Sequence, residues 1–545
     1  MKTLIVSIVV LTMEFISYTQ NVVIPDTAFL HALIDMGVDT DGDGLISFEE
    51  AESVTSMDFE YEYHSYGGCL QSLGIESLNG IEAFTNLDSL QCRCNSIVNL
   101  NLSDNIALEY LDCRDNQLTS LDVSKNTALK ELNCNSNQLT SLDVSKNTSL
   151  EKLVCYGNQL TNLDVSKNIV LTVLECSEND LTNLDVSNNT ALKELICYGV
   201  QLTNLDVSKN TMLTILDCGW NDITSLDVSN NTALIEMGCY KTGLTGLDVS
   251  ENVALERLMC AGNELTSIDV SKNTALEELI CGWFWSTGNY LTSLDVSNNT
   301  ALKHLQCSYC RLTSLDVSKN TALEKLICYG NQLTNLDVSK NTALTYLNCG
   351  HWENVGNFLT SLDVTNNIAL SSLCCARNNL IMLDVSHNTA LEFLDCGFNQ
   401  FTILDVSNNT SLEELWLHEM PTLQKVCVRE IPFPPDTVIV YTDGSPNVNF
   451  TTDCSEPDSV TNFITCNENS SITIYPNPSN NFINIVIDNT TNAIIEIYDV
   501  SGNLVFSKEQ NSILIKIDVS VFPIGVYFLK VKQVSAVFVR KVVVR

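Results

Sequence analysis

A unit of 21 residues recurs along most of this chain and restricts the folds that are open to it. Residues 118–138 read LTSLDVSKNTALKELNCNSNQ, and fourteen related units begin at positions from Leu118 to Phe401. Two looser units precede them, at Ile75 and Ile97. A single unit has too few apolar side chains to form its own core, so successive units must stack and share a continuous one.

Each unit contains a short segment in which apolar and polar residues alternate. In ELNCN, residues 131–135, we expect Leu132 and Cys134 to point inward and Glu131, Asn133 and Asn135 to point outward. The longer stretch LKELNCNSNQL fits the pattern L-x-x-L-x-L-x-x-N-x-L and resembles the leucine-rich repeat family. The resemblance covers residues 75 to about 417. It implies a leucine-rich repeat solenoid over residues 69–417, of about 16 coils of 21–22 residues, with a parallel β-sheet on its concave face.

The cysteines follow the same repeat. Of 22 cysteines, fifteen occupy the third Leu position of successive units: Cys92, Cys113, Cys134, Cys155, Cys176, Cys197, Cys218, Cys239, Cys260, Cys281, Cys307, Cys328, Cys349, Cys375 and Cys396. We expect buried thiols there, because stacked strands hold neighbouring Cβ vectors parallel, which suits a disulfide poorly. Cys427 and Cys454 lie outside this column and are the candidates for a disulfide. Cys69, Cys94 and Cys466 are assigned no partner.

Two polar columns accompany the cysteines. The Asn that follows most of the expected strands, as at Asn116 and Asn137, can bond the backbone of adjacent turns. Val200 and Thr242 break this column, and Cys310 takes its place once. The Asp of LDVS recurs from Asp122 to Asp405. We expect each of these Asp residues to accept turn amides as an Asx-type cap, and a row of bridging calcium ions is the alternative.

The N-terminal part of the chain contains an export signal and a candidate metal loop. Residues 1–19 carry Lys2 and an apolar run, which is typical of a secretory signal peptide. Residues 20–68 include DTDGDGLISFEE, which resembles an EF-hand loop flanked by two helices. The resemblance implies one structural Ca²⁺ with ligands in loop order: Asp39, Asp41, Asp43, the Leu45 carbonyl, Ser47 through water, and Glu50.

The C-terminal part departs from the repeat. Residues 418–466 form β-rich runs broken by proline, followed by a polar linker, and we interpret them as a cap and linker. Residues 467–545 alternate in hydropathy and predict a small all-β sandwich. Their stretches YPNPSNNFINI, IYDVSGNLV and GVYFLKV resemble the type A C-terminal sorting domain of the type IX secretion system of Bacteroidetes. This resemblance implies the type IX secretion machinery as a partner, export to the cell surface or medium, and release or attachment to surface lipopolysaccharide.

Two insertions interrupt the regular 21-residue repeat. CGWFWSTGNYL, residues 281–291, and CGHWENVGNFL, residues 349–359, each add five residues at the end of an expected strand. They supply the candidate ligand-binding residues Trp283, Phe284, Trp285, Tyr290, His351, Trp352 and Phe358. Tyr156, Tyr198, Tyr240 and Tyr329 follow the column cysteines and are a second candidate set. The alternative for both sets is copying of the repeat without a binding role.

The composition restricts the function. A net charge of −38 argues against nucleic acid as a partner, because nucleic-acid binding needs clustered cations. The motifs of metalloproteases, nucleophile elbows and phosphate loops are missing from the sequence, so we expect no enzyme. The first unit, GIESLNGIEAFTNLDSL, resembles the repeats of bacterial internalins. We therefore expect an exported monomer that recognises a protein or glycan ligand. The alternatives are a structural surface-coat protein, or ice binding through a Thr column that begins at Thr119.

Overall fold

The computed structural model describes residues 21–59, 72–283, 288–351, 356–435, 438–454, 472–475, 482–487, 493–499, 504–510, 514–523, 525–532 and 537–544. They belong to two compact units that divide between Asp453 and Cys454. The signal peptide and the residues Cys69, Phe284, Trp285, Trp352 and Cys466 lie outside these ranges. Within the described ranges, no helix has the length and apolarity needed to cross a bilayer.

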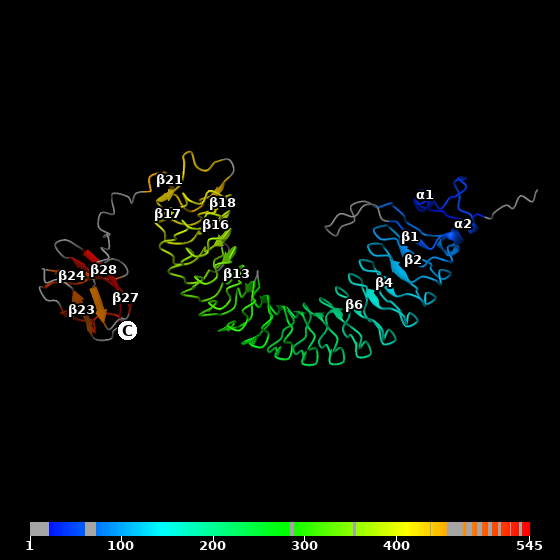
Figure 1. Cartoon of the computed structure of the whole chain (residues 1–545), viewed down its shortest axis with the longest axis horizontal. Helices are drawn as coiled ribbons and strands as arrows, with labels where there is room; N and C mark the ends of the chain where they lie inside the picture. The colour runs from blue at the N-terminus through cyan, green and yellow to red at the C-terminus, as the bar shows by residue number, and fades with distance from the viewer. Residues whose placement is uncertain are drawn as a thin grey trace, which may run out of the picture. The chain divides into compact units, whose positions relative to one another are not determined.

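The repeats form a curved stack of coils whose three-residue strands line its inner side (Figure 1). Sixteen of these strands come from the repeats and pair in parallel, each with the next coil. Their bounds are β2 (Ser89–Gln91), β3 (Tyr110–Asp112), β4 (Glu131–Asn133), β5 (Lys152–Val154), β6 (Val173–Glu175), β7 (Glu194–Ile196), β8 (Ile215–Asp217), β9 (Glu236–Gly238), β10 (Arg257–Met259), β11 (Glu278–Ile280), β12 (His304–Gln306), β13 (Lys325–Ile327), β14 (Tyr346–Asn348), β15 (Ser372–Cys374), β16 (Phe393–Asp395) and β18 (Glu414–Trp416). This confirms the predicted solenoid.

The core of the stack is a set of columns in which each residue lies on its equivalent in the next coil. Leu132 pairs in register with Leu111 and Leu153. Leu132 is 1% exposed and Cys134 is fully buried, whereas Glu131 faces solvent, as predicted. The prediction that Asn135 points outward is wrong: it is 2% exposed, because the strand and its alternation end at Asn133. Burial of each Leu contributes about 1.5–3 kcal/mol relative to its exposure. Because neighbouring coils share this burial, the stability of one coil depends on the coils beside it.

Asparagine side chains join the coils on both sides of this core. Asn137 Nδ2 donates to the carbonyls of Cys113 and Cys134, at 3.1 Å each, while its Oδ1 accepts the Leu118 amide at 3.0 Å. This confirms the predicted role of that column. A second column, the Asn of SKNT, was not anticipated. There Asn147 Nδ2 donates to the carbonyls of Val123 and Asn126 in the preceding coil, at 3.0 and 2.8 Å.

The LDVS aspartates act within their own turns. Asp122 Oδ1 accepts the Ser124 amide at 2.9 Å, and the same contact recurs down the column to Asp405 and Ser407. That hydrogen bond holds the pKa of Asp122 below its ordinary value. The structure therefore supports the Asx-type cap.

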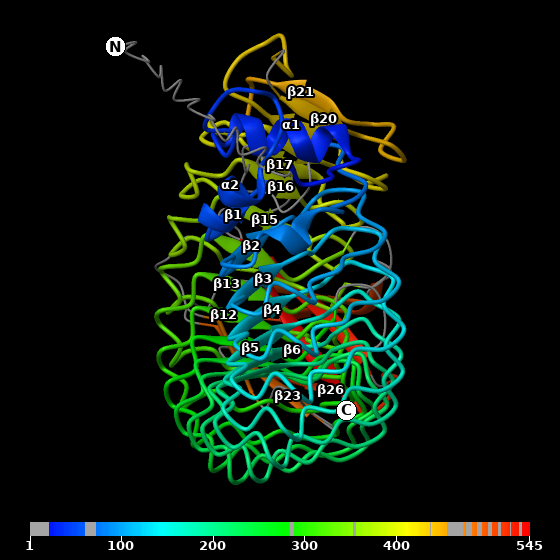
Figure 2. The same ribbon diagram turned by 90° about the vertical axis from the view of Figure 1, so that its right-hand side faces the viewer.

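The N-terminal cap packs on the first repeat and extends the sheet (Figure 2). The predicted helices are α1 (Thr27–Asp35) and α2 (Phe48–Ser53), and β1 (Ser56–Asp58) pairs in parallel with β2. A 3-10 turn, η1 (Ile81–Ala83), follows in the first repeat. Asp26 caps α1 through the Ala28 amide and also accepts the Glu76 amide at 2.8 Å. One side chain thus begins the helix and attaches the cap to the solenoid.

The stack ends with two further strand pairings. β20 (Ile439–Tyr441) adds to β18, so the residues after the last repeat continue the concave sheet. A separate parallel sheet contains β17 (Ile403–Asp405), β19 (Lys425–Cys427) and β21 (Asn449–Thr451). These short strands cover the last coil, which would otherwise expose its Leu side chains.

The second unit is built from two antiparallel sheets around one core. The first sheet contains β22 (Ile472–Tyr475), β23 (Phe482–Ile487) and β26 (Leu514–Asp518), and the second contains β24 (Ala493–Tyr498), β25 (Leu504–Gln510), β27 (Gly525–Lys532) and β28 (Val537–Val544). Ile483 and Ile517 from the first sheet share one buried cluster with Ile497 and Leu529 from the second. The predicted β-sandwich is therefore confirmed.

The fifteen column cysteines are buried and unpaired, as predicted. Burial raises the pKa of the Cys134 thiol to about 12, which keeps it protonated at neutral pH. Cys94, which the sequence left without a partner, is disulfide-bonded. Cys427 is buried and Cys454 is exposed, and their pairing stays a prediction.

Thiol titration tests this cysteine column. We expect the native, unreduced protein to react slowly with a thiol reagent, and the same protein in guanidinium chloride to release at least the fifteen column thiols, because only unfolding exposes them. A blank without protein gives the lower limit of the thiol signal, and a fully reduced, unfolded sample gives the upper limit. Quantitative pairing of the column cysteines in the unfolded, unreduced sample would contradict the stacking geometry.

Candidate functional site

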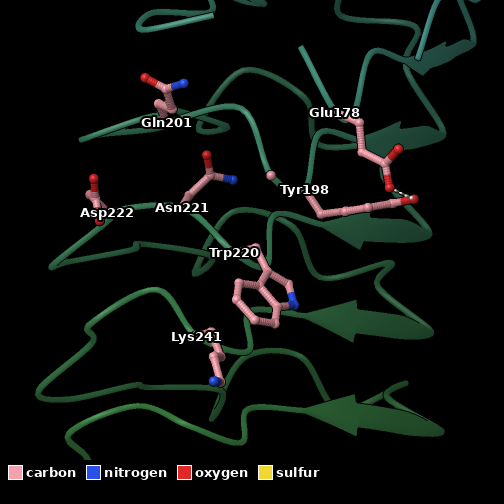
Figure 3. A pocket seen from close by; sticks show the side chains of 8 residues that line it. Glu178, Tyr198, Gln201, Trp220, Asn221, Asp222 and Lys241 are labelled. Atoms are coloured by element: carbon pink, nitrogen blue, oxygen red, sulfur yellow. Dashed lines mark hydrogen bonds between the residues drawn. The ribbon is translucent and has the colours of Figure 1, made fainter. Parts of the chain in front are cut away.

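A pocket lies where four successive strands of the concave sheet lead into their loops (Figure 3). Its volume is about 620 Å³. Glu178 follows β6, Tyr198 follows β7, Trp220 follows β8 and Lys241 follows β9. The complete lining is Glu178, Tyr198, Gly199, Gln201, Trp220, Asn221, Asp222 and Lys241. Because the strands are in register, residues 21 or so positions apart meet at one edge of the sheet.

Aromatic rings from separate coils lie beside this pocket. We call these rings, together with Lys241, the rim cluster: Tyr198, Trp220, Tyr240, Lys241 and Trp283. Trp283, from the first insertion, stacks on Tyr240 with ring centroids 6.0 Å apart and meets Trp220 edge-on at 6.3 Å. The Lys241 ammonium lies 4.6 Å from the Trp220 ring centre and 5.2 Å from that of Trp283. The insertion and the Tyr column, predicted as two separate sets, thus contribute to one site.

The Tyr240 ring packs closely against two glycines. A Cβ on Gly219 would lie 2.7 Å from the Tyr240 ring, and one on Gly238 would lie 3.3 Å from it. The Tyr240 hydroxyl donates to Asp217 Oδ2 at 3.3 Å. Burial raises the pKa of both groups, so Tyr240 is neutral at physiological pH and can donate this hydrogen bond.

Polar groups surround the rings on the side of the pocket. The Tyr198 hydroxyl donates to Glu178 Oε1 at 3.3 Å. Gln201 Nε2 donates to Asp180 Oδ1 at 3.2 Å. Lys241 forms no ion pair with any residue in the described ranges, although acidic residues outnumber basic ones by 66 to 28 in the chain. Its ammonium group instead rests on two indole rings.

The residues that shape the pocket adopt a backbone conformation that side chains disfavour. Glu178, Trp220 and Lys241, each two positions after a column cysteine, have φ values of 52°, 51° and 54°. Some other coils place glycine at this position, as at Gly157 and Gly199, and others a side chain with positive φ, as at Asp115 and Arg377. A bulky residue with positive φ is a backbone outlier that costs about 1–2 kcal/mol. The fold therefore accepts either glycine or a side chain here, and the pocket is lined where three nearby coils carry side chains.

The other predicted ligand residues have different surroundings. Tyr329 is 2% exposed and packs edge-on against Tyr309 at 5.3 Å, so the prediction of an open aromatic platform is wrong at this position. His351 lies against Tyr329, with centroids 4.7 Å apart. Tyr156 is half-buried two coils before Tyr198. The described parts of the two insertions therefore contact different coils and belong to separate aromatic groups.

The last residues of each insertion restore the repeat. Asn289 Nδ2 donates to the carbonyls of Cys260 and Cys281, at 2.9 and 2.8 Å, and Asn357 makes the equivalent contacts. Tyr290 lies beneath the Arg311 guanidinium at 4.3 Å. Phe358 is exposed. After the described end of each insertion, the chain thus returns to the usual amide contacts of the stack.

Sequence reasoning missed Trp220, which is 52% exposed and central to the rim cluster. The signal was present in CGWND, residues 218–222, where Trp occupies a position that glycine takes in CYGNQ and CAGNE. The predicted Tyr set contains only residues directly after a column cysteine. Trp220 lies two positions after Cys218 and is therefore not part of that set.

The EF-hand-like loop brings part of its predicted ligand set together. Oxygens of Asp39, Asp41 and Asp43 lie within 4.8 Å of one another, a spacing that fits one hard cation. Asp39 accepts the Gly42 and Gly44 amides at 2.7 and 2.9 Å, and Gly44 has a φ of 81°. The donor set of three carboxylates at a tight turn therefore suits Ca²⁺, with the Leu45 carbonyl available in the same loop.

Glu50, the last predicted ligand, is engaged elsewhere in this conformation. Its Oε2 accepts the Ser47 amide and hydroxyl at 2.9 Å each, which forms a capping box at α2, and its Oε1 accepts two bonds from Thr40 at 2.7 Å. These bonds, with that of the Ser47 amide the largest, lower the pKa of Glu50 to about 2. Glu50 is therefore ionised at neutral pH.

Comparison with known families agrees with this architecture. Residues 473–545 match the secretion system C-terminal sorting domain, and residues 106–147 match leucine-rich repeats in two copies. An LVIVD repeat model matches residues 218–242 and 397–416. No curated protein matches the sequence.

Solved structures share the solenoid. The functional domain of InlJ from Listeria monocytogenes, described as including a cysteine ladder, is 28% identical with a TM-score of 0.52, over 92% of this chain and 93% of that one. A leucine-rich repeat protein of Leptospira interrogans is 22% identical with a TM-score of 0.56, over 72% and 97%. An internalin, InlF, of L. monocytogenes is 22% identical with a TM-score of 0.52, over 61% and 96%.

The chain contains leucine-rich repeats, and its coils stack into a solenoid like that of the solved structures. Its C-terminal sorting domain indicates export through the type IX secretion system to the cell surface or the extracellular space.

A pair of substitutions tests the backbone argument at the pocket. Trp220→Ala and Trp220→Gly remove the same ring, but only glycine relieves the positive φ. We expect the Gly variant to be more stable than the Ala variant by about 1 kcal/mol, measured by chemical denaturation. In ordinary strand or helix positions Ala is the more stable of the two. A matched Ala and Gly pair at Glu131, in strand β4, should give that ordinary order, and the ordinary order at Trp220 would contradict the argument.

Proposed function

We propose that this protein is a non-enzymatic binding protein that acts outside the cell and recognises a protein or glycan ligand at the rim cluster. The observation that carries the proposal is the half-exposed Trp220, held with positive φ beside Lys241 and Trp283 over a pocket of about 620 Å³. Aromatic rings give contact area at low entropic cost and are enriched at interaction hot spots. A structural coat protein would need no such pocket.

The sorting domain supports an extracellular site of action. A ligand would then be met at the cell surface or in the medium, and the type IX secretion machinery would be the partner during export. We further propose that the exported protein is then released or attached to surface lipopolysaccharide.

A pull-down from extracellular material, together with a glycan array, tests the proposal. We expect a ligand whose capture falls at least about tenfold in Trp220→Gly, because removal of a hot-spot aromatic costs 1.4 kcal/mol or more. Trp283→Ala should also weaken capture, since it removes the ring that contacts both Tyr240 and Trp220.

Tyr156→Ala is the matched control for these variants. Tyr156 occupies the same repeat position as Tyr198 but lies outside the rim cluster, so its loss should leave capture unchanged. Self-assembly of the protein that is insensitive to all three substitutions, without ligand capture, would favour the coat-protein alternative and contradict the proposal.

We also propose that the loop from Asp39 to Glu50 binds one structural Ca²⁺. Asp39, Asp41 and Asp43 would supply side-chain oxygens, the Leu45 carbonyl a fourth, and Ser47 a contact through water. Glu50 would complete the ligand set by giving up its hydrogen bonds from Thr40 and binding the ion instead. A bound cation would brace the cap that pairs β1 with the first repeat strand.

Calcium titration by calorimetry tests this site. We expect one Ca²⁺ per chain, and a rise in the unfolding temperature on adding Ca²⁺ that chelation reverses, because an ion that binds only the folded state stabilises it. Asp41→Asn should weaken binding, while Asp122→Asn in the LDVS column is the control. A stoichiometry near the fourteen LDVS aspartates, or no binding, would contradict the single loop site.

A further inference from the structure

The chemistry of the pocket narrows the class of ligand, on the condition that the rim cluster binds a ligand at all. We infer that the pocket takes a neutral sugar unit of a glycan. The inference uses three observations: an indole ring open on one side, a lining rich in hydrogen-bonding groups, and an arrangement of charge that opposes both anions and cations.

The indole ring of Trp220 provides a surface for stacking. Its side chain is 52% exposed, Lys241 lies over the ring at 4.6 Å, and Trp283 meets it edge-on. The ring is therefore held in place by its neighbours, so little conformational entropy is lost when a ligand packs on it. The C–H face of a pyranose ring is flat and apolar, and it matches such a surface.

The groups around the ring suit hydroxyl groups. Glu178 and Asp222 are exposed carboxylates that accept hydrogen bonds, while Gln201 offers both a donor and an acceptor. Each sugar hydroxyl both donates and accepts, so adjacent hydroxyls can use this mixture. The volume of about 620 Å³ lies within the range of about 300–1,000 Å³ that is usual for small-ligand sites. It accommodates a short oligosaccharide chain end.

The charges in the site disfavour ionic ligands of either sign. An anionic sugar would approach the carboxylates of Glu178 and Asp222 in a protein with a net charge of −38. A cationic side chain would seek the indole rings, but Lys241 already holds the cation–π position on Trp220 and Trp283. A neutral polyol meets neither penalty. The same argument disfavours a basic peptide, the main protein ligand that an acidic surface would attract.

An array of neutral oligosaccharides (glucans, galactans and mannans), with polygalacturonate as an acidic glycan, tests the inference on the full mature chain. We expect binding to a neutral member, with an affinity that changes less than about twofold between 0.05 and 0.5 M NaCl because no ion pair forms. For that oligosaccharide, Trp220→Gly should weaken binding at least about tenfold. Glu178→Gln should weaken it less, and Tyr156→Ala should leave it unchanged.

The possible outcomes separate this inference from the proposed function. One outcome is that only polygalacturonate binds, that its binding depends on Trp220, and that this binding is lost at high salt and in Lys241→Met. This result would overturn the neutral-sugar inference but would agree with the proposed binding function. Trp220-dependent capture of a protein with no glycan bound would do the same. If no ligand of either class depends on Trp220, the proposed function fails and this inference fails with it.

Discussion

The coil-to-coil contact is the interaction on which the rest of the structure depends. Leu132 lies on Leu111 and Leu153, and Asn137 bonds the carbonyls of two successive coils at 3.1 Å. Dispersion and burial favour any close stacking of apolar units, but the amide bonds hold each coil in one register. Cys134 fits between them because a thiol is small and accepts full burial.

This fixed register also creates the site. Glu178, Trp220 and Lys241 belong to different coils, yet they meet because each occupies the same position after its strand. The insertion at Trp283 can reach Tyr240 because Asn289 returns the chain to the stack with the usual amide contacts. The rim cluster therefore needs no fold element of its own, and its geometry follows from the frame that all coils share.

The sequence predicts the solenoid, its buried cysteines and the sandwich at the C-terminus because these follow from periodicity, which is local information repeated many times. It locates Trp283, Tyr198 and Tyr240 but treats them as two sets, since their meeting depends on how a loop folds back over two coils. It does not single out Trp220, because the candidate Tyr set is defined by the residue directly after the column cysteine, and Trp220 lies one position later, where some other coils carry glycine. The second Asn column is not predicted, because Asn is common in turns and its presence in SKNT does not by itself indicate a contact between coils.

The left-handed position after each column cysteine has a consequence for how such a protein diversifies. Its backbone shape is the same with glycine, as at Gly199, and with tryptophan, as at Trp220. A single codon change can therefore add or remove a contact group on one coil while the hydrophobic interior and its amide bonds remain untouched. The residue at this position can therefore change independently in each coil. New recognition surfaces can arise by substitution there while the folded core stays the same.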